Sequence, residues 1–452
     1  MKLLLPLLLF LLFPFAVVMG QKSILDEYIE MGFQQNIVLQ QKSISAEKAL
    51  LSLQSAQSLY QPTLAFQGGY QTGEGGRSIS FPVGDMLNPV YATLNQLTKS
   101  AAFPQINNVE TNFFPRNFYD VKLTSVMPIY NRDISINKEI QSQTLGIQKA
   151  DIQVYKRELV KNIKTAYLNY LMAHKAIGIY QNGLLLAQEG KKINEKLLAN
   201  GKGLPAYILR SENEIVQLGS QLSEAEKQAE SAKMYFNFLL NRELLTEIKT
   251  NYNEQEALDI LKKTLVVEVD QREELSMLKQ AISLQQSVVK MNEGFYLPKL
   301  NGYLNLGSQS SNWDFNQKST YYLLGMQVDI PIFSGKRNLN KIKQSAMDVD
   351  MAKKSLDLTS KQVNLALQIA QKNLTQTWVA FRASQKQIDV ANTYQKLIDK
   401  GYKEGVNTYI ETLDARSQWT NAHLLLNINQ FKILIAAAQV EREAATYPLK
   451  ND

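Results

Sequence analysis

One pattern of strands, prolines and long helices occurs twice in this chain of 452 residues. The segment Val121–Tyr130 (VKLTSVMPIY) precedes a long helical stretch. A similar segment, Met326–Phe333 (MQVDIPIF), lies about 203 residues further on and precedes another. Upstream of each, Tyr60–Leu64 (YQPTL) corresponds to Tyr296–Leu300 (YLPKL). A long repeat that mixes strands and helices predicts a duplicated module rather than a solenoid of short units.

The duplication predicts two structural repeats that follow a short leader. Each repeat is expected to contain a helix, two strands and a long helical hairpin. The expected boundaries are a leader at 1–20, a first repeat at 21–241 and a second repeat at 242–452. In the first repeat we expect strands at about 63–71 and 118–128 and a hairpin tip near 201–206. In the second we expect strands at about 299–307 and 321–331 and a tip near 401–408.

The first 20 residues have the features of a secretory signal peptide. Lys2 supplies the positive charge, Leu3–Val18 is an apolar run, and Gly20 offers a small residue for cleavage. A membrane-anchoring helix is the alternative, but two prolines interrupt the run. No later stretch approaches the ~20 apolar residues of a spanning helix. Any further embedding in a membrane is therefore expected to use strands.

Composition argues against most chemical functions. The chain has no cysteine and two histidines, so we expect no disulfide, no metal site and no cofactor. The net charge of +7 comes from lysines and arginines interleaved with acids, which is typical of solvated helices rather than of nucleic-acid binding. An enzyme is one alternative class, but no Ser-His-Asp, HExxH, Walker or GxGxxG arrangement lies in a suitable context. We expect no catalytic residue.

Two helical stretches are unusually long. Residues 131–200 contain no proline and would extend ~105 Å, and residues 337–400 would extend ~95 Å. Shorter helices are expected at 24–60, 204–241, 254–295 and 408–446. Apolar residues recur at alternating steps of four and three in both long stretches, which predicts a supercoiled helical tube rather than one compact bundle. This seam contains Leu159, Ile163, Ala166, Tyr170, Ala173, Ile177, Tyr180, Leu184 and Ala187, and then Val363, Leu367, Ala370, Leu374, Thr377, Phe381, Ser384, Ile388 and Ala391.

The strands alternate apolar and polar residues in the same phase in both repeats, as in transmembrane barrels. Four strands cannot close a barrel, and an open sheet edge is not tolerated in lipid. Three copies would supply twelve strands and an aqueous lumen, whereas two would supply eight and a filled interior. A homotrimer is therefore favoured, and a soluble β-sandwich fragment is the alternative. The apolar phase contains Leu64, Phe66, Gly68 and Tyr70; Tyr119, Val121, Leu123, Ser125 and Met127; Leu300, Gly302, Leu304 and Leu306; and Tyr322, Leu324, Met326, Val328 and Ile330.

The two loops between paired strands differ greatly in length. Ser308–Ser319 is short, whereas Thr72–Asn117 is long and rich in glycine, proline, asparagine and aromatic residues. Loops of this length are usually functional or disordered. We expect the longer loop to lie outside the cell, where it could fold over the mouth of a pore.

The tip of the second hairpin, Gly401–Ala415 (GYKEGVNTYIETLDA), resembles the periplasmic tip of the TolC family of outer-membrane efflux proteins. The first tip, Gly201–Tyr207 (GKGLPAY), is a weaker match. The resemblance implies an α+β membrane protein. Three chains would share a 12-stranded outer-membrane β-barrel, with four strands from each, continued by a long periplasmic α-helical barrel.

This resemblance also implies a function, a location and partners. The function would be a channel-tunnel in the outer membrane of a Gram-negative bacterium, the exit duct of a tripartite efflux or secretion system for small molecules or proteins. The partners would be two further copies of the chain, a periplasmic adaptor (membrane fusion) protein, an inner-membrane RND or ABC pump and outer-membrane lipid, with no nucleic acid. A periplasmic coiled-coil adaptor is the alternative function.

The resemblance assigns site residues at both tips. A periplasmic gate would contain Tyr402, Asn407, Glu411 and Asp414, and the adaptor would contact Gly201, Gly203, Leu204, Gly405, Val406 and Thr408. In the family an arginine links the helices at the position of Asn407, and the position of its acidic partner holds Leu209. Arg416 or Arg210 could substitute. The alternative for Glu411 and Asp414 is that they are acids that stabilise a helix start.

Overall fold

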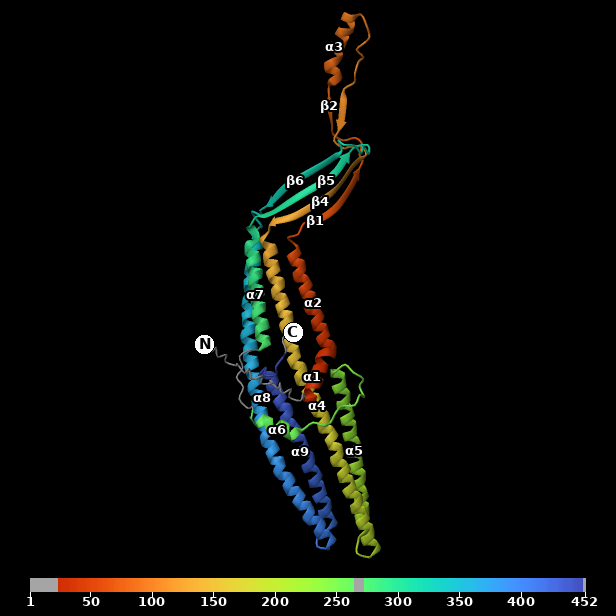
Figure 1. The fold of residues 1–452 in the computed structure, drawn as a ribbon, viewed down its shortest axis with the longest axis vertical. Coiled ribbons are helices and arrows are strands. Elements are labelled where there is room, and N and C mark those ends of the chain that lie inside the picture. The colour runs from red at the N-terminus through yellow and green to blue at the C-terminus, as the bar shows by residue number, and fades with distance from the viewer. Residues whose placement is uncertain (1–22, 264–271, 450–452) are drawn as a thin grey trace, which may run out of the picture. The chain divides into compact units, whose positions relative to one another are not determined.

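The computed structural model describes residues 23–263 and 272–449, which are mostly helical (Figure 1). The signal peptide expected at 1–20 lies outside the described residues. The α-helices are α1 (Ile24–Gln35), α2 (Ile37–Ser58), α3 (Val83–Thr98), α4 (Arg132–Ala199), α5 (Pro205–Leu239), α6 (Glu254–Lys263), α7 (Glu273–Glu293), α8 (Arg337–Lys403) and α9 (Tyr409–Glu443). The strands are β1 (Thr63–Gln71), β2 (Ser78–Phe81), β3 (Val109–Asn112), β4 (Phe118–Tyr130), β5 (Lys299–Ser310) and β6 (Thr320–Asp329).

The chain forms two compact units, and each unit takes segments from both sequence repeats. The first unit comprises the chain up to Lys48, Leu145–Ala281 and the chain from Met351 onward. The second comprises Ala49–Thr144 and Ile282–Asp350. The long helices α4 and α8 contribute residues to both units. A compact unit therefore does not correspond to a repeat of the sequence.

The helix expected at 24–60 is in fact two helices, because Asn36 ends α1 and begins α2. Its backbone is extended, with φ of −65° and ψ of 121°. Its side-chain oxygen accepts from the Leu39 amide at 3.1 Å and from the Tyr155 hydroxyl at 3.0 Å. Its side-chain nitrogen donates to the Leu239 carbonyl, near the end of α5, at 3.0 Å. Asparagine is a preferred helix N-cap, and here the capping side chain also joins two other helices.

The core of the first unit lies where α1 packs against α4 and the end of α5. The ring of Tyr28 meets Phe236 edge-on at 4.9 Å and lies 5.6 Å from Tyr167. Both tyrosine hydroxyls bond the backbone of Lys249: Tyr167 donates to its carbonyl at 2.8 Å, and Tyr28 accepts from its amide at 3.0 Å. The connection after α5 is therefore attached to the core by buried hydroxyl groups, whose partners offset their desolvation.

Burial confirms most of the predicted helical seam. The large seam residues Leu159 and Ile163 on α4, and Leu374 and Phe381 on α8, are buried. The small seam residues Ala166, Ala370, Ser384 and Ala391 are buried as well, whereas Thr377 is half-buried. Residues 173–184 of the seam are only half-buried in a single chain. The face of each long helix that alternates large and small side chains is therefore the face that packs against other helices.

A buried network of charges joins the start of α7 to the end of α9. Arg272 is 2% exposed, donates to the Glu443 carboxylate at 2.9 Å and bonds Glu274 through two nitrogens at 2.7 and 2.9 Å. Arg442 extends the network to Glu158 of α4 at 3.0 Å. Burial opposes the charge of Arg272, but its bonds to Glu274 and Glu443 outweigh burial and raise its pKa. Two helix ends from opposite parts of the sequence thus meet through paired charges.

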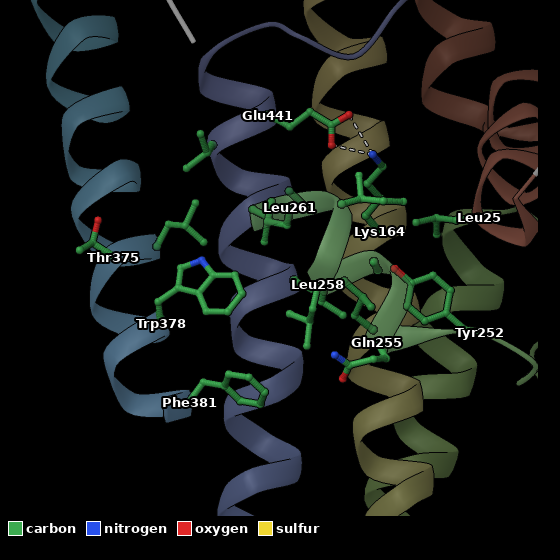
Figure 2. A pocket seen from close by; sticks show the side chains of 18 of the residues that line it. Leu25, Lys164, Tyr252, Gln255, Leu258, Leu261, Thr375, Trp378, Phe381 and Glu441 are labelled. Atoms are coloured by element: carbon green, nitrogen blue, oxygen red, sulfur yellow. Dashed lines mark hydrogen bonds and ion pairs between the residues drawn. The ribbon is translucent and has the colours of Figure 1, made fainter. Parts of the chain in front are cut away.

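The helix expected at 254–295 is described in two parts: α6 extends to Lys263 and α7 starts at Glu273. Residues 264–271 lie outside the described residues. The first unit has a cavity of about 1250 Å³ lined by α6, α8 and α9 (Figure 2). Leu258 of α6 and the rings of Trp378 and Phe381 of α8 line it, and the ion pair between Lys164 and Glu441, at 2.6 Å, lies at its edge. Its walls are therefore mainly apolar.

The second unit contains a four-stranded antiparallel sheet in the order β1-β4-β5-β6 (Figure 1). Its strands lie near the four expected positions, and its outer strands β1 and β6 each have one neighbour among the described residues. The loop expected at 72–117 is structured: β2 pairs with β3, and α3 lies between them. We refer to Thr72–Asn117 as the excursion.

Candidate functional site

The four-stranded sheet has one apolar face. Residues paired across antiparallel strands point to the same side of a sheet. Phe66 of β1 lies opposite Leu123 of β4, Leu123 lies opposite Leu306 of β5, and Leu306 lies opposite Tyr322 of β6. The apolar phase of every strand is therefore in register with that of its neighbour. Most of its large side chains are exposed, including Leu64, Phe66, Leu123, Met127, Leu306, Tyr322, Leu324, Met326 and Val328.

The opposite face of the sheet is more polar, although it includes the exposed Leu323. Thr124 lies opposite Asn305, and Lys122 lies opposite Gln67 on one side. Asp120 on this face accepts from Lys122 at 2.9 Å and from the Tyr321 hydroxyl at 2.9 Å. A sheet with an exposed apolar face and a polar face is suited to separate lipid from water.

Tyr119 departs from the pattern predicted for the apolar face. It is buried rather than exposed, because Phe315 and Trp313 from the β5–β6 loop stack on its ring at 4.3 and 5.8 Å. Its hydroxyl bonds Ser308 at 2.9 Å. The short loop thus covers the first apolar position of β4.

The hairpin tips are tight turns whose shape depends on glycine. Gly201 and Gly405 have φ of 68° and 78°, a left-handed conformation that disfavours other residues. Leu204 and Val406 beside them are exposed apolar residues. Gly203 packs against the backbone of Leu198, and a side chain there would be too close. The residues expected to contact an adaptor are thus mainly backbone and small apolar groups at two rigid turns.

Glu411 takes part in a capping box at the start of α9. Its carboxylate accepts from the Thr408 amide at 2.6 Å and from the Asn407 side chain at 3.2 Å, and its amide donates to the Thr408 hydroxyl at 3.3 Å. These bonds lower the pKa of Glu411. Asp414 accepts from Gln418 at 2.8 Å. These local contacts match the alternative prediction that Glu411 is an acid that stabilises the start of a helix. Its side chain is nevertheless exposed.

Tyr402 lies apart from these acids and links the two hairpins of the chain. Its hydroxyl bonds the side chain of Asn194 on α4. Asn194 in turn donates to the Ser211 hydroxyl at 2.8 Å, and Ser211 bonds the Tyr409 hydroxyl at 2.8 Å. Asn194, Ser211 and Tyr409 are all buried. The four predicted gate residues thus divide: one lies in this buried chain of hydrogen bonds, and three lie at the start of α9.

Arg416 of α9 lies close to a buried acid of the other hairpin. It forms an ion pair with Glu214 of α5 at 3.6 Å, and both side chains are largely buried. Its Nε and Nη1 atoms have no hydrogen-bond partner. Burial raises the pKa of Glu214 and of Asp399 on α8, while the charge of Arg416 opposes both rises. We call Arg416, Glu214, Asp399 and Tyr409 the tip cluster.

Sequence reasoning named Arg416 as a substitute cation but did not identify Glu214. The helical spacing could have pointed to it, because Glu214 lies three residues after Ser211 and therefore on the same face of α5. The predicted alternative, Arg210, is exposed. Asn194 was also missed, because a polar residue within a long charged helix resembles any solvated position.

The tip cluster predicts a pH dependence. The pKa of Glu214 is raised in the packed tip, so the packed tip binds a proton that the unpacked tip releases. Its contribution to stability is therefore complete below the ordinary glutamate pKa and is lost as the pH rises through the raised value. We expect the free energy of opening of the amides of α5 and α9, measured by hydrogen exchange, to fall across this range.

The Glu214→Gln variant should lose the part of this dependence that Glu214 contributes, because glutamine does not titrate. It should keep the part that Asp399 contributes, since burial raises the pKa of that carboxyl as well. Glu212→Gln is the matched control on the same helix, since Glu212 is exposed and pairs with Lys191 at 2.9 Å. It should keep the dependence of the parent protein. Equal pH dependence in the parent and Glu214→Gln would show that this carboxyl does not control tip packing.

Two kinds of feature are not found within the described residues. No group of three or more histidine, cysteine, aspartate or glutamate side chains there could hold a metal ion. In residues 23–263 and 272–449 no helix is long and apolar enough to cross a membrane.

Comparisons with known proteins find both similar sequences and similar structures. The sequence model of one family, described as "Outer membrane efflux protein", matches residues 265–445. The outer membrane protein TolC of Vibrio cholerae is 21% identical over 387 residues, which cover 77% of this chain and 86% of that protein. The chain is similar to outer-membrane efflux proteins of the TolC type. It is an outer-membrane protein of a Gram-negative bacterium, with a large periplasmic part.

Other similar proteins match over a shorter region or show the fold alone. The protease secretion protein PrtF of Dickeya chrysanthemi is 20% identical over 302 residues. The matched region spans 64% of the length of PrtF and 64% of this chain. The crystal structure of the CmeC outer membrane channel of Campylobacter jejuni is similar with a TM-score of 0.73 and 13% identity, covering 93% of this chain and 85% of CmeC.

Proposed function

We propose that three copies of this chain form the exit duct of a tripartite efflux or secretion system. Each copy would contribute four strands to a 12-stranded barrel in the outer membrane and helices to a periplasmic tunnel. The cargo would be small molecules or proteins. The proposal extends to this chain the roles that the names of its relatives state, namely efflux for the family and protease secretion for PrtF.

The single observation that supports this function best is the composition of the sheet. All four strands present their apolar residues on one face in register, and most of the large apolar side chains are exposed in a single chain. Within the described part of the chain, strands β1 and β6 each have one neighbour, so each keeps an unpaired edge. Unpaired backbone groups are not tolerated in lipid. Pairing β1 of one copy with β6 of the next would satisfy both edges and close the barrel.

The tips are proposed as the periplasmic gate and the adaptor contact. Glu411 and Asp414 are exposed acids, each with contacts confined to its own hairpin. In a three-fold assembly, copies of such acids around an axis would repel one another and favour cations. The exposed Leu204 and Val406 at the turns offer an apolar contact to a periplasmic adaptor. The tip cluster would hold the two hairpins of each chain together.

The test is conduction by the purified full-length protein. We expect a species with three times the mass of the chain in detergent, and ion channels after reconstitution in planar bilayers. In the Glu411→Gln, Asp414→Asn variant, the preference for cations over anions should fall about fivefold, since about 1 kcal/mol per close charge pair in water corresponds to that factor. Glutamine at 411 is compatible with the capping box, so the helix start should remain.

Asp357→Asn is the matched control for charge, because Asp357 is an exposed acid on α8 that pairs with Lys361 at 2.8 Å. Its ion preference should equal that of the parent protein. A protein that is released from membranes without detergent and forms no channels would contradict the duct and favour a periplasmic adaptor. Channels whose ion preference is unchanged in the double variant would contradict the gate residues alone.

A further inference from the structure

The excursion is an ordered structure held together by asparagine side chains. Asn88 of α3 bonds both backbone groups of Ile106, donating to its carbonyl and accepting from its amide at 2.9 Å each. Asn95 bonds Phe103 in the same way at 2.7 and 3.0 Å. Each asparagine side chain supplies hydrogen-bond partners that the backbone of the extended segment 103–108 would otherwise lack. The segment is thereby fixed along one side of α3.

Helix α3 has two opposite stripes, and only one of them is occupied. The occupied stripe contains Gly84, Asn88, Tyr91 and Asn95, which are spaced by four, three and four residues and are buried or half-buried against segment 103–108. The opposite stripe lies two residues further on in each case. It contains Met86, Val90, Thr93 and Leu97, all exposed, and we call these four residues the α3 seam.

The spacing of the α3 seam is that of a helix that packs against another helix. Steps of four, three and four residues place Met86, Val90, Thr93 and Leu97 on one line, as the core positions of a coiled coil require. Met86 and Leu97, at its two ends, are 70% and 77% exposed. Nothing among the described residues covers them, although a solvent-facing helix normally places polar residues on such a stripe.

The composition of α3 indicates which helix would cover the seam. Within Val83–Thr98 the only charged residue is Asp85, which accepts a bond from Asn108 at 2.9 Å. A second copy of α3 would therefore meet no repulsion, and it would present the same four side chains at the same spacing. A basic or acidic partner would find no complementary charge along this helix.

The attachment of the excursion points to the same occupant. The excursion leaves and rejoins the sheet at one pair of residues, Gln71 of β1 and Phe118 of β4, which lie opposite each other. Because β1 is an outer strand of the sheet, this residue pair lies at the β1 edge, which the next copy would join in the proposed barrel. Symmetry would give every copy an identical α3 at the same height along the axis.

We propose that the α3 seams of the three copies pack against one another as a parallel three-helix coiled coil outside the barrel. The seam residues Met86, Val90, Thr93 and Leu97 would form its core. The inference rests on the proposed trimer and adds to it a second, extracellular contact between chains. Each chain would then contact its neighbours through its excursion as well as through its strands.

The test uses disulfide formation, since the parent chain has no cysteine. Leu97→Cys in the full-length protein, oxidised in isolated outer membranes, should give disulfide-linked dimers on non-reducing gels. Only two of three cysteines around an axis can pair, so a monomer band should persist. Ala92→Cys is the matched control, because Ala92 is exposed on the same helix but lies well away from the seam. It should give at least tenfold less dimer.

A second variant tests the apolar core of the seam. Adding Leu97→Glu to a Met86→Cys protein would place three carboxylates together, and we expect at least a tenfold loss of the dimer formed by Met86→Cys alone. The mass of each variant in detergent, measured in parallel, reports the trimer independently.

Each outcome decides the inference. Intact trimers without a Leu97→Cys dimer would overturn the α3 contact, leave the proposed duct in place and assign the seam to another partner. Equal dimer from Ala92→Cys would overturn it too, because it would indicate random collision. Monomers alone would overturn both this inference and the proposed trimer.

Discussion

Replacing Arg416 with alanine is expected to weaken the contact between the two helical hairpins by about 3 kcal/mol. The guanidinium is largely buried and forms an ion pair with Glu214 at 3.6 Å. Its removal would leave Glu214 and Asp399 buried near one another without a cation. Breaking a buried pair typically costs about 3–5 kcal/mol. The lower end applies here because Glu214, whose pKa burial already raises, can take up a proton.

Hydrogen exchange of α5 and α9 in the assembled protein measures this effect, and channel conductance in bilayers measures its functional result. We expect faster exchange at both helices and a higher conductance from the loosened tip. Arg210→Ala, at an exposed position on α5, should change neither. The double variant Arg416→Met, Glu214→Gln should approach the parent protein, since replacing both partners of a buried pair is often neutral. Parent-like exchange in Arg416→Ala would refute the role of this pair.

Arg272→Ala should be the most destabilising single change, lowering the free energy of unfolding by about 3–5 kcal/mol. Arg272 is 2% exposed and bonds Glu274 and both the carboxylate and the carbonyl of Glu443. Without it, the cation that remains within 4 Å of these buried acids, among the described residues, is Arg442, at 3.3 and 3.0 Å. Loss of helical circular dichroism in guanidinium, compared at equal protein concentration, is the measurement.

Two further variants separate the charge of Arg272 from its geometry. Arg272→Lys keeps the charge but cannot bond two acids with a planar fork, so it should show an intermediate loss. Lys361→Ala removes an exposed pair with Asp357 and should change the free energy by less than about 1 kcal/mol. If Arg272→Ala unfolded at the same denaturant concentration as Lys361→Ala, the network would contribute no more than a surface pair does.

Periodicity made most of the architecture predictable from the sequence. The long helices and the strands have patterns that depend on which face is buried, so α4, α8 and the four strands could be placed from them. The break at Asn36 was not predicted, because the apolar pattern continues on both sides of it. Its cause is a tertiary contact, since the Asn36 side chain bonds Leu239, a residue distant in sequence. Such a partner cannot be read from local propensity.

The candidate site was predictable only where chemistry is local. The capping box of Thr408 and Glu411 follows from residues three apart, and the sequence alternative of a helix-start acid describes it. The tip cluster joins Glu214, Asp399 and Arg416 from three helices, so no spacing in the sequence reveals it. The fold of the excursion was missed for a related reason: Asn88 and Asn95 bond backbone groups, and asparagine-rich segments usually form loops.

The residue pair at the two ends of the excursion has an evolutionary consequence. Gln71 and Phe118 are neighbours in the β1–β4 ladder, so the ends of the excursion are held together by the sheet. The entropy of closing such a loop grows slowly, by only about 0.6 kcal/mol for each doubling of its length. Lengthening, shortening or exchanging this segment therefore leaves the strands nearly unaffected. In the proposed duct the excursion lies outside the cell, so its sequence could diverge while the strands that carry it are preserved.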